Sequence, residues 1–213
     1  AQHAWTWGVE ATRTDTRQKR DGLATNLSTG TSTPSIPPDV FPVRDFPNSR
    51  VDKTALFVQD EITFGDGELR LVPAMRVDRH ALRPGVDAIF AADNPGVAVV
   101  DVTRTHVSPK LGLVWRFAPD WSLFAGHAPG FRAPPYSDVN IGFTNLAFGY
   151  TAIANPDLKP ETSRGFEAGV RHDGRAGWFS FTAYDNRYRD FIEALRFIGV
   201  NEAGLMVFQS QNV

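Results

Sequence analysis

Residues 106–117 read HVSPKLGLVWRF, and this stretch carries the clearest structural pattern in the chain. Every second residue from Val107 to Phe117 is apolar, apart from the small Pro109 interruption, and the intervening side chains are mostly polar or small. A period of two places successive side chains on opposite faces of an extended strand. The stretch therefore predicts a β-strand with an apolar face and a polar face. The two sets are Val107, Leu111, Leu113, Trp115 and Phe117, and His106, Ser108, Lys110, Gly112, Val114 and Arg116.

The same alternation recurs along the chain on both sides of this strand. Strand-like segments fall at residues 3–13, 51–64, 68–79, 106–117, 121–127, 166–171, 176–188 and 206–213. One residue breaks the pattern, because Asp60 falls on the apolar face of its segment. The pattern predicts an all-β chain of about eight antiparallel strands.

The connections between these segments alternate between short and long. Tight turns are predicted at 65–67, 118–120 and 173–175, and long connections at about 14–50, 80–105, 130–161 and 189–205. Short turns at one end and long loops at the other are typical of a transmembrane β-barrel with periplasmic turns and extracellular loops. A tilted strand needs about 9–11 residues to cross a bilayer, which agrees with the segment lengths. Aromatic residues near segment ends fit interfacial girdles: Trp5, Trp7, Trp115, Phe117, Trp121 and Trp178.

A soluble β-sandwich or a lipocalin-like barrel is the alternative, since both also alternate. Charged side chains in the middle of the polar faces favour a watery lumen over a dry core. We therefore expect one face toward lipid and the other toward the lumen. The lipid-facing set is Leu111, Leu113, Trp115, Phe166, Ala168 and Val170, and the lumen-facing set is Lys110, Gly112, Glu167, Gly169 and Arg171.

Composition and motifs give no support for catalysis, for a protein-bound metal or for nucleic-acid binding. The net charge is −2 and the chain has no cysteine. The five histidines do not cluster at metal-ligand spacing, and the sole grouping that resembles a catalytic set is His127 with Ser137 and Asp138. We predict that the protein is not an enzyme and that it has no metal site and no resident cofactor.

Residues 131–162 form a long stretch with neither a helical nor a strand period, and loops of this length are usually functional. Its ends carry two motifs, Phe131-Arg132-Ala133-Pro134 and Asn155-Pro156-Asp157-Leu158. Their prolines stiffen the two ends of the loop, so we interpret both motifs as mainly structural. Aromatic residues between them are candidates to bind a flat apolar ligand or a protein, or alternatively to pack on one another: Tyr136, Phe143, Phe148 and Tyr150.

The paired FRAP and NPDLKPET motifs resemble TonB-dependent outer-membrane receptors, and more narrowly the branch that takes up haem and haemoglobin. The resemblance implies a 22-stranded barrel in the outer membrane of a Gram-negative bacterium, in contact with outer-membrane lipid. It also implies import of haem, or haem from a haemoprotein, driven by the TonB system through a plug domain. Haem would then be a transported ligand. A siderophore or other-ligand receptor of the same family is the alternative, and a small passive barrel or adhesin is the alternative outside it.

The chain departs from the family pattern in two respects. Residues 1–213 contain no counterpart of a plug domain or a TonB-binding segment, and they supply too few strands for 22. We therefore expect an internal fragment, a partial barrel. Residues 135–154 also contain no histidine, which many haem receptors place there to ligate iron. Either Tyr136 or Tyr150 replaces it, or the ligand is not haem. His127, four residues before Phe131, is expected to be a dispensable rim histidine.

Overall fold

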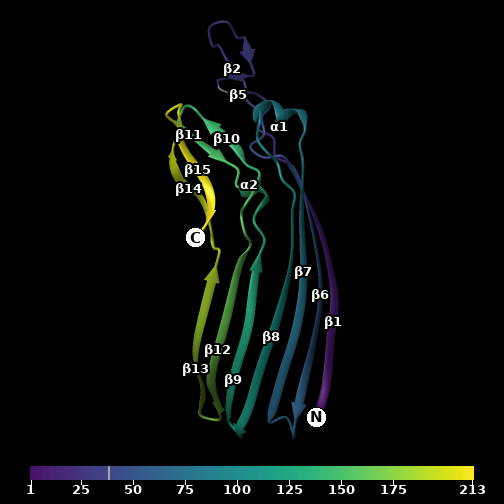
Figure 1. Cartoon of the computed structure of the whole chain (residues 1–213). Helices are drawn as coiled ribbons and strands as arrows, with labels where there is room; N and C mark the ends of the chain where they lie inside the picture. The colour runs from purple at the N-terminus through teal and green to yellow at the C-terminus, as the bar shows by residue number, and fades with distance from the viewer. Residues whose placement is uncertain (38) are drawn as a thin grey trace.

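The computed structural model describes residues 1–37 and 39–213, and its main feature is one curved sheet of seven long antiparallel strands (Figure 1). The predicted antiparallel all-β architecture is confirmed. In spatial order the strands are β1 (Gln2–Thr16), β6 (Asn48–Phe64), β7 (Leu69–Gly85), β8 (Val102–Ala118), β9 (Trp121–Arg132), β12 (Glu161–Gly174) and β13 (Gly177–Arg189).

The three predicted tight turns all lie at one end of this sheet, and the long connections all lie at the other (Figure 1). The turn between β6 and β7 contains Gly65 and Gly67 at φ values of 60° and 90°. Both angles belong to the left-handed region, where glycine has no Cβ to clash. The strands run well beyond the predicted segments, since β7 continues to Gly85 and β8 begins at Val102.

Cross-strand partners in a sheet share a face, so the register assigns each side chain to one of two surfaces. Leu113 pairs with Ala125, which pairs with Ala168, while Gly112 pairs with Gly126, which pairs with Glu167. The two predicted sets of side chains therefore do occupy opposite faces. The apolar face ends near the turns in a row of aromatic contacts, with ring centroids 5.8 Å apart for Trp115 and Phe117, and 5.5 Å apart for Trp121 and Phe179.

Asp60 breaks the apolar pattern because it has a partner on the same face. Its side chain is 7% exposed, and its Oδ2 lies 2.7 Å from His3 Nδ1 on the neighbouring strand. The residue directly opposite Asp60 in the register is Trp5, two residues after His3 on the same strand. A buried carboxylate with a hydrogen-bonding partner costs far less than an isolated one.

A second, four-stranded sheet lies over the loop end, in the order β10 (Gly142–Asn145), β11 (Tyr150–Ile153), β15 (Met206–Asn212) and β14 (Ile192–Val200). The predicted strand at 206–213 exists, but it belongs to this sheet and is not an eighth strand of the main one. It runs parallel to β11. Its amide side chains explain the placement: Gln209 donates to the Ala154 carbonyl (2.8 Å) and Asn212 to the Lys159 carbonyl (3.0 Å).

The remaining loop elements are short. The connection between β1 and β6 contains β2 (Ala24–Thr25), β3 (Ser32–Thr33), β4 (Ser35–Ile36) and β5 (Asp39–Val40), and the one between β7 and β8 contains α1 (Ala88–Asp93). Asp87 caps α1 by accepting from the Phe90 amide (3.0 Å). Within the described ranges, no helix is both long and apolar enough to cross a membrane.

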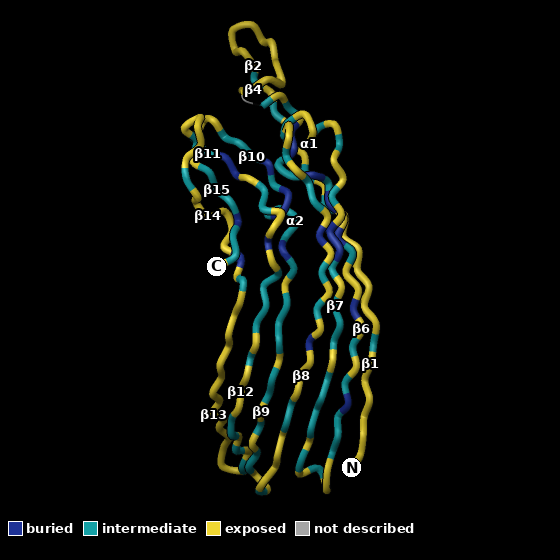
Figure 2. Tube along the Cα trace, viewed as in Figure 1, coloured by how far each residue is buried: buried dark blue, intermediate teal, exposed yellow. Residues whose placement is uncertain are grey.

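Buried residues concentrate where the loop ends of the long strands meet the 131–162 segment (Figure 2). The apolar cluster there consists of Val51, Leu82, Val102, Val139, Leu158 and Ile192. Nearer the turns, large apolar side chains of the outward face are exposed, for example Trp7 at 73% and Phe181 at 67%, whereas Trp178 pairs with Asp173 on the polar face and is not part of an outward aromatic girdle. An extended apolar surface on a single-layer sheet fits contact with lipid.

Candidate functional site

The FRAP and NPDLKPET motifs, 24 residues apart in sequence, meet as neighbours at the loop end of the main sheet. Arg132 of β9 pairs in register with Glu161 of β12, and its Nη1 donates to Glu161 Oε2 at 3.0 Å. The other oxygen, Oε1, accepts from the backbone amide of Ile192 at 2.8 Å. One carboxylate thus joins both ends of the loop to the start of β14. Glu161 was not among the candidate residues selected from sequence, although it lies within the NPDLKPET motif.

The FRAP motif turns the chain from β9 into the buried cluster. The Phe131 ring stacks on His106 of β8, with centroids 4.7 Å apart and planes 8° from parallel. Pro134 is fully buried, and Pro135 stands at the N-terminal boundary of the short helix α2 (Tyr136–Val139). Three residues of this motif region are therefore fixed by packing, which agrees with a loop-shaping role.

The NPDL motif anchors the return path. Asn155 Oδ1 accepts from the Asp157 amide (3.1 Å), a local turn that asparagine favours, and Asn155 Nδ2 donates to the Ser210 carbonyl of β15 (2.8 Å). Leu158 is 1% exposed within the buried cluster, whereas Pro156 and Asp157 are exposed. Asn155 and Leu158 therefore hold this motif in place, whereas Pro156 and Asp157 face solvent.

Two of the four loop aromatics, Phe143 and Tyr150, pack in the second sheet. The rings of Phe143 and Tyr150 are 5.6 Å apart, and Tyr150 meets Phe208 edge to face at 6.0 Å. The Arg20 guanidinium lies 5.1 Å from the Phe143 ring centre. Phe148 is 75% exposed at the β10–β11 turn. Phe143 and Tyr150 therefore contribute to the packing of the loop, whereas Phe148 does not.

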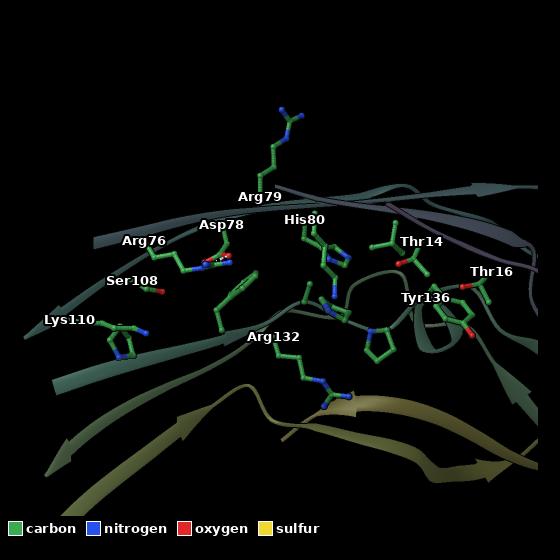
Figure 3. A pocket seen from close by; sticks show the side chains of 17 residues that line it. Thr14, Thr16, Arg76, Asp78, Arg79, His80, Ser108, Lys110, Arg132 and Tyr136 are labelled. Carbon is green, nitrogen blue, oxygen red and sulfur yellow. Dashed lines mark hydrogen bonds and ion pairs between the residues drawn. The ribbon is translucent and has the colours of Figure 1, made fainter. Parts of the chain in front are cut away.

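Tyr136 lies apart from these three and borders a cavity of about 590 Å³ on the polar face of the sheet (Figure 3). Its ring packs edge-on against Phe46, with centroids 5.0 Å apart. The loop contributes residues 131–136 to the lining, and the strands contribute mainly polar side chains: Arg76, Asp78, His80, Ser108 and Lys110. The cavity thus combines aromatic and charged walls, as ligand sites commonly do.

The charges of the cavity wall are partly neutralised by one another. Arg76 donates to Asp78 through Nε (2.8 Å) and to Glu10 through Nη2 (2.8 Å). His80 Nε2 is buried and has no hydrogen-bond partner among the described residues. His80 was not among the candidates selected from sequence, although it continues the alternation of Arg76 and Asp78 on the polar face of β7.

His127 does not belong to this cavity. Its Nδ1 donates to the Gly165 carbonyl (3.0 Å), and its ring stacks on Phe166 with centroids 4.3 Å apart. In register it pairs with Leu111 on the apolar face of the sheet. Ser137 and Asp138 lie on α2, where the serine hydroxyl donates to the carboxylate (3.4 Å). The catalytic grouping considered from sequence is therefore not assembled.

Burial raises the pKa of Asp138 above its ordinary value, against the lowering effect of the Ser137 hydrogen bond and of Arg132. In the part of the chain that the structure describes, no group of three or more His, Cys, Asp and Glu side chains is placed to hold a metal ion.

Residues 1–213, the whole chain, match the family model of the TonB-dependent receptor-like β-barrel. The chain belongs to the TonB-dependent receptor β-barrel family. The resemblance inferred from the FRAP and NPDL motifs is therefore confirmed, as is the placement in the outer membrane of a Gram-negative bacterium.

Two curated relatives and one solved structure illustrate the range of the family. The haemoglobin-haptoglobin utilization protein B of Neisseria meningitidis serogroup C is 31% identical over 140 residues, covering 64% of this chain and 17% of its own. The ferrienterobactin receptor of Escherichia coli strain K12 is 26% identical over 210 residues, covering 92% and 25%. The copper transporter OprC has a similar structure, with a TM-score of 0.67 at 19% identity over 99% of this chain and 30% of its own. This TonB-dependent receptor chain thus spans a quarter or less of the length of these two relatives.

Proposed function

We propose that the chain forms part of a TonB-dependent receptor that imports an iron source, and that this source is haem or haem taken from a haemoprotein. The observation that carries the proposal is the Arg132–Glu161 pair, which closes the two motif ends beside a cavity bordered by Phe131 and Tyr136. The relative named for haemoglobin-haptoglobin use supports the choice of ligand.

The proposed transport involves no covalent reaction, and haem is the cargo. The loops at the motif end would meet the ligand outside the cell, with Phe148 exposed for contact with a haemoprotein. Tyr136 is our candidate iron ligand, because a tyrosinate can ligate haem iron and this side chain borders the cavity. Energy would come from a TonB partner acting through a plug domain, which residues 1–213 do not contain.

A siderophore receptor is the second candidate. The ferrienterobactin receptor matches nearly the whole chain, and the loop between the two motifs holds no histidine. Aromatic and basic side chains, both present around the cavity, would also suit an anionic aromatic chelate. The same cavity would then hold a different cargo.

Growth of a haem-auxotrophic Gram-negative host that carries the full-length parent receptor tests the proposal. We expect growth on haem or haemoglobin to depend on the receptor and to fall with Tyr136→Phe, while Tyr150→Phe, the matched loop tyrosine, retains it. Growth on a ferric catecholate siderophore, with none on haem, would instead establish the second candidate.

A further inference from the structure

A second hollow lies on the opposite, apolar face of the sheet, with a volume of about 810 Å³, between β8, β9, β12 and β13. It lies where β8 and β9 stop pairing. Their ladder ends at Leu111 and His127, and the same register would set Pro109 opposite Pro129. Proline has no amide hydrogen to give to a ladder, so the two strands part at this point and open the hollow.

Three arginines line the outer end of this hollow. Arg164 of β12 stands directly opposite Arg187 of β13, and Arg189 is the next residue of β13 on the same face. Like charges in directly opposed positions destabilise a sheet. The nearby acid is Asp185, which accepts from Arg187 Nε (2.9 Å). Arg164 and Arg189 form no ion pair with any residue of 1–37 or 39–213. The site therefore carries a surplus of positive charge.

The inner end of the hollow is apolar, with Val107 of β8 and Phe166 of β12 in its wall. From His172, in the aromatic row near the turns, to Arg164 is eight residues along β12, or about 26 Å at about 3.3 Å per residue, which is a rise of about 20 Å for a strand tilted by about 40°. The apolar band of an outer-membrane barrel is about 25 Å tall. The Arg164 backbone therefore lies near the top of the apolar band, and its long side chain reaches the outer-leaflet headgroups.

We propose that this hollow binds a phosphorylated lipid of the outer leaflet. A phosphate between Arg164 and Arg187 would accept charge-assisted hydrogen bonds from both guanidinium groups and remove their repulsion. The acyl chains would lie along Val107 and Phe166. This site is on the other face of the sheet from the lumen cavity, so it is independent of the imported cargo.

The test uses the full-length receptor, stripped of lipid in detergent and titrated with a bisphosphorylated glucosamine lipid. Bound lipid is measured by native mass spectrometry and its stabilising effect by thermal unfolding. We expect the double variant Arg164→Gln/Arg187→Gln to bind about tenfold more weakly. Arg79→Gln is the matched control. The Arg79 side chain points away from the lumen cavity (Figure 3) and lies outside the hollow. This variant should bind the lipid as tightly as the native receptor does.

Without lipid, Arg187→Gln should unfold at a higher temperature than the native receptor, because the variant lacks the repulsion. With lipid the order should reverse. Equal binding by the native receptor and the double variant would overturn the proposal, as would an equal loss in Arg79→Gln, which would indicate unspecific charge. Equal binding of the dephosphorylated lipid would refute headgroup recognition, and full displacement by inorganic phosphate would reassign the site to a free anion.

Discussion

A single carboxylate, Glu161, holds the candidate ligand loop together at the residue scale. It is 12% exposed and bonds both the Arg132 guanidinium and the Ile192 amide. Replacing it with alanine leaves that amide without its partner, which costs about 1–3 kcal/mol. Glu161→Gln keeps an acceptor, and Arg132→Ala removes only a largely exposed partner, worth about 1 kcal/mol or less. Urea unfolding of the full receptor in vesicles should rank the losses as Glu161→Ala, then Glu161→Gln, then Arg132→Ala. A larger loss from Arg132→Ala would contradict this.

Asp138 gives the loop a pH dependence. Burial raises the pKa of its carboxyl in the folded loop, so the folded state holds the proton more tightly than the unfolded one. Stability from this group is therefore present below its ordinary pKa and is lost as the pH rises through the raised value. Asp138→Asn should slow amide exchange across α2 at neutral pH, and this difference should vanish in acid. Weaker protection of the asparagine variant at neutral pH would show that the carboxylate is favourable there.

At the residue scale, the sequence located the motifs but not their contacts. Pro134 of FRAP, the following Pro135 and the NPDL asparagine were recognisable because their turn preferences are local. The roles of Glu161, His80 and His106 depend on strand register, which no single stretch contains. Which of Tyr136 and Tyr150 borders a cavity was equally beyond prediction, since Tyr150 pairs in the second sheet with Met206, which is 56 positions later in the chain.

At the element scale, β8 allows a test of the two faces with adjacent residues. Leu113 lies on the apolar face with Ala125, and Val114 lies on the polar face with Phe124. Leu113 lies in the middle of the bilayer, so Leu113→Arg should destabilise the folded receptor, reducing its free energy of unfolding by about 2–4 kcal/mol. Val114→Arg places the same charge in the lumen and should cost far less. Folding titrations of the full receptor into vesicles provide the measurement, and equal losses would mean that the faces are misassigned.

The strands were predictable because alternation is a local signal, and the tight turns because glycine and proline mark them. The 206–213 segment shows the limit of that signal. Its alternation is that of a strand, but the choice of sheet depends on Gln209 and Asn212 reaching carbonyl groups at 154 and 159. Helix α1 was missed because six residues are too few to establish a helical period.

At the scale of the whole molecule, the main sheet is an open arc with β1 and β13 as its edges. All side chains of β13 are exposed, and an open strand edge does not persist in lipid, where backbone groups need partners. The family is one of closed barrels, so we infer that these seven strands supply one arc of such a barrel. The apolar face then meets the membrane and the polar face lines the interior of the barrel.

The central claim is that this arc and its loop bind haem, and haem titration of the intact receptor, followed by its Soret band, tests it most directly. We predict saturable binding that is unchanged in His127→Ala, because this ring faces the apolar side and bonds to Gly165. Binding should weaken sharply in Tyr136→Phe, the tyrosine that borders the lumen cavity. Loss of binding in His127→Ala, with full binding in Tyr136→Phe, would contradict the assignment of Tyr136 as the haem ligand.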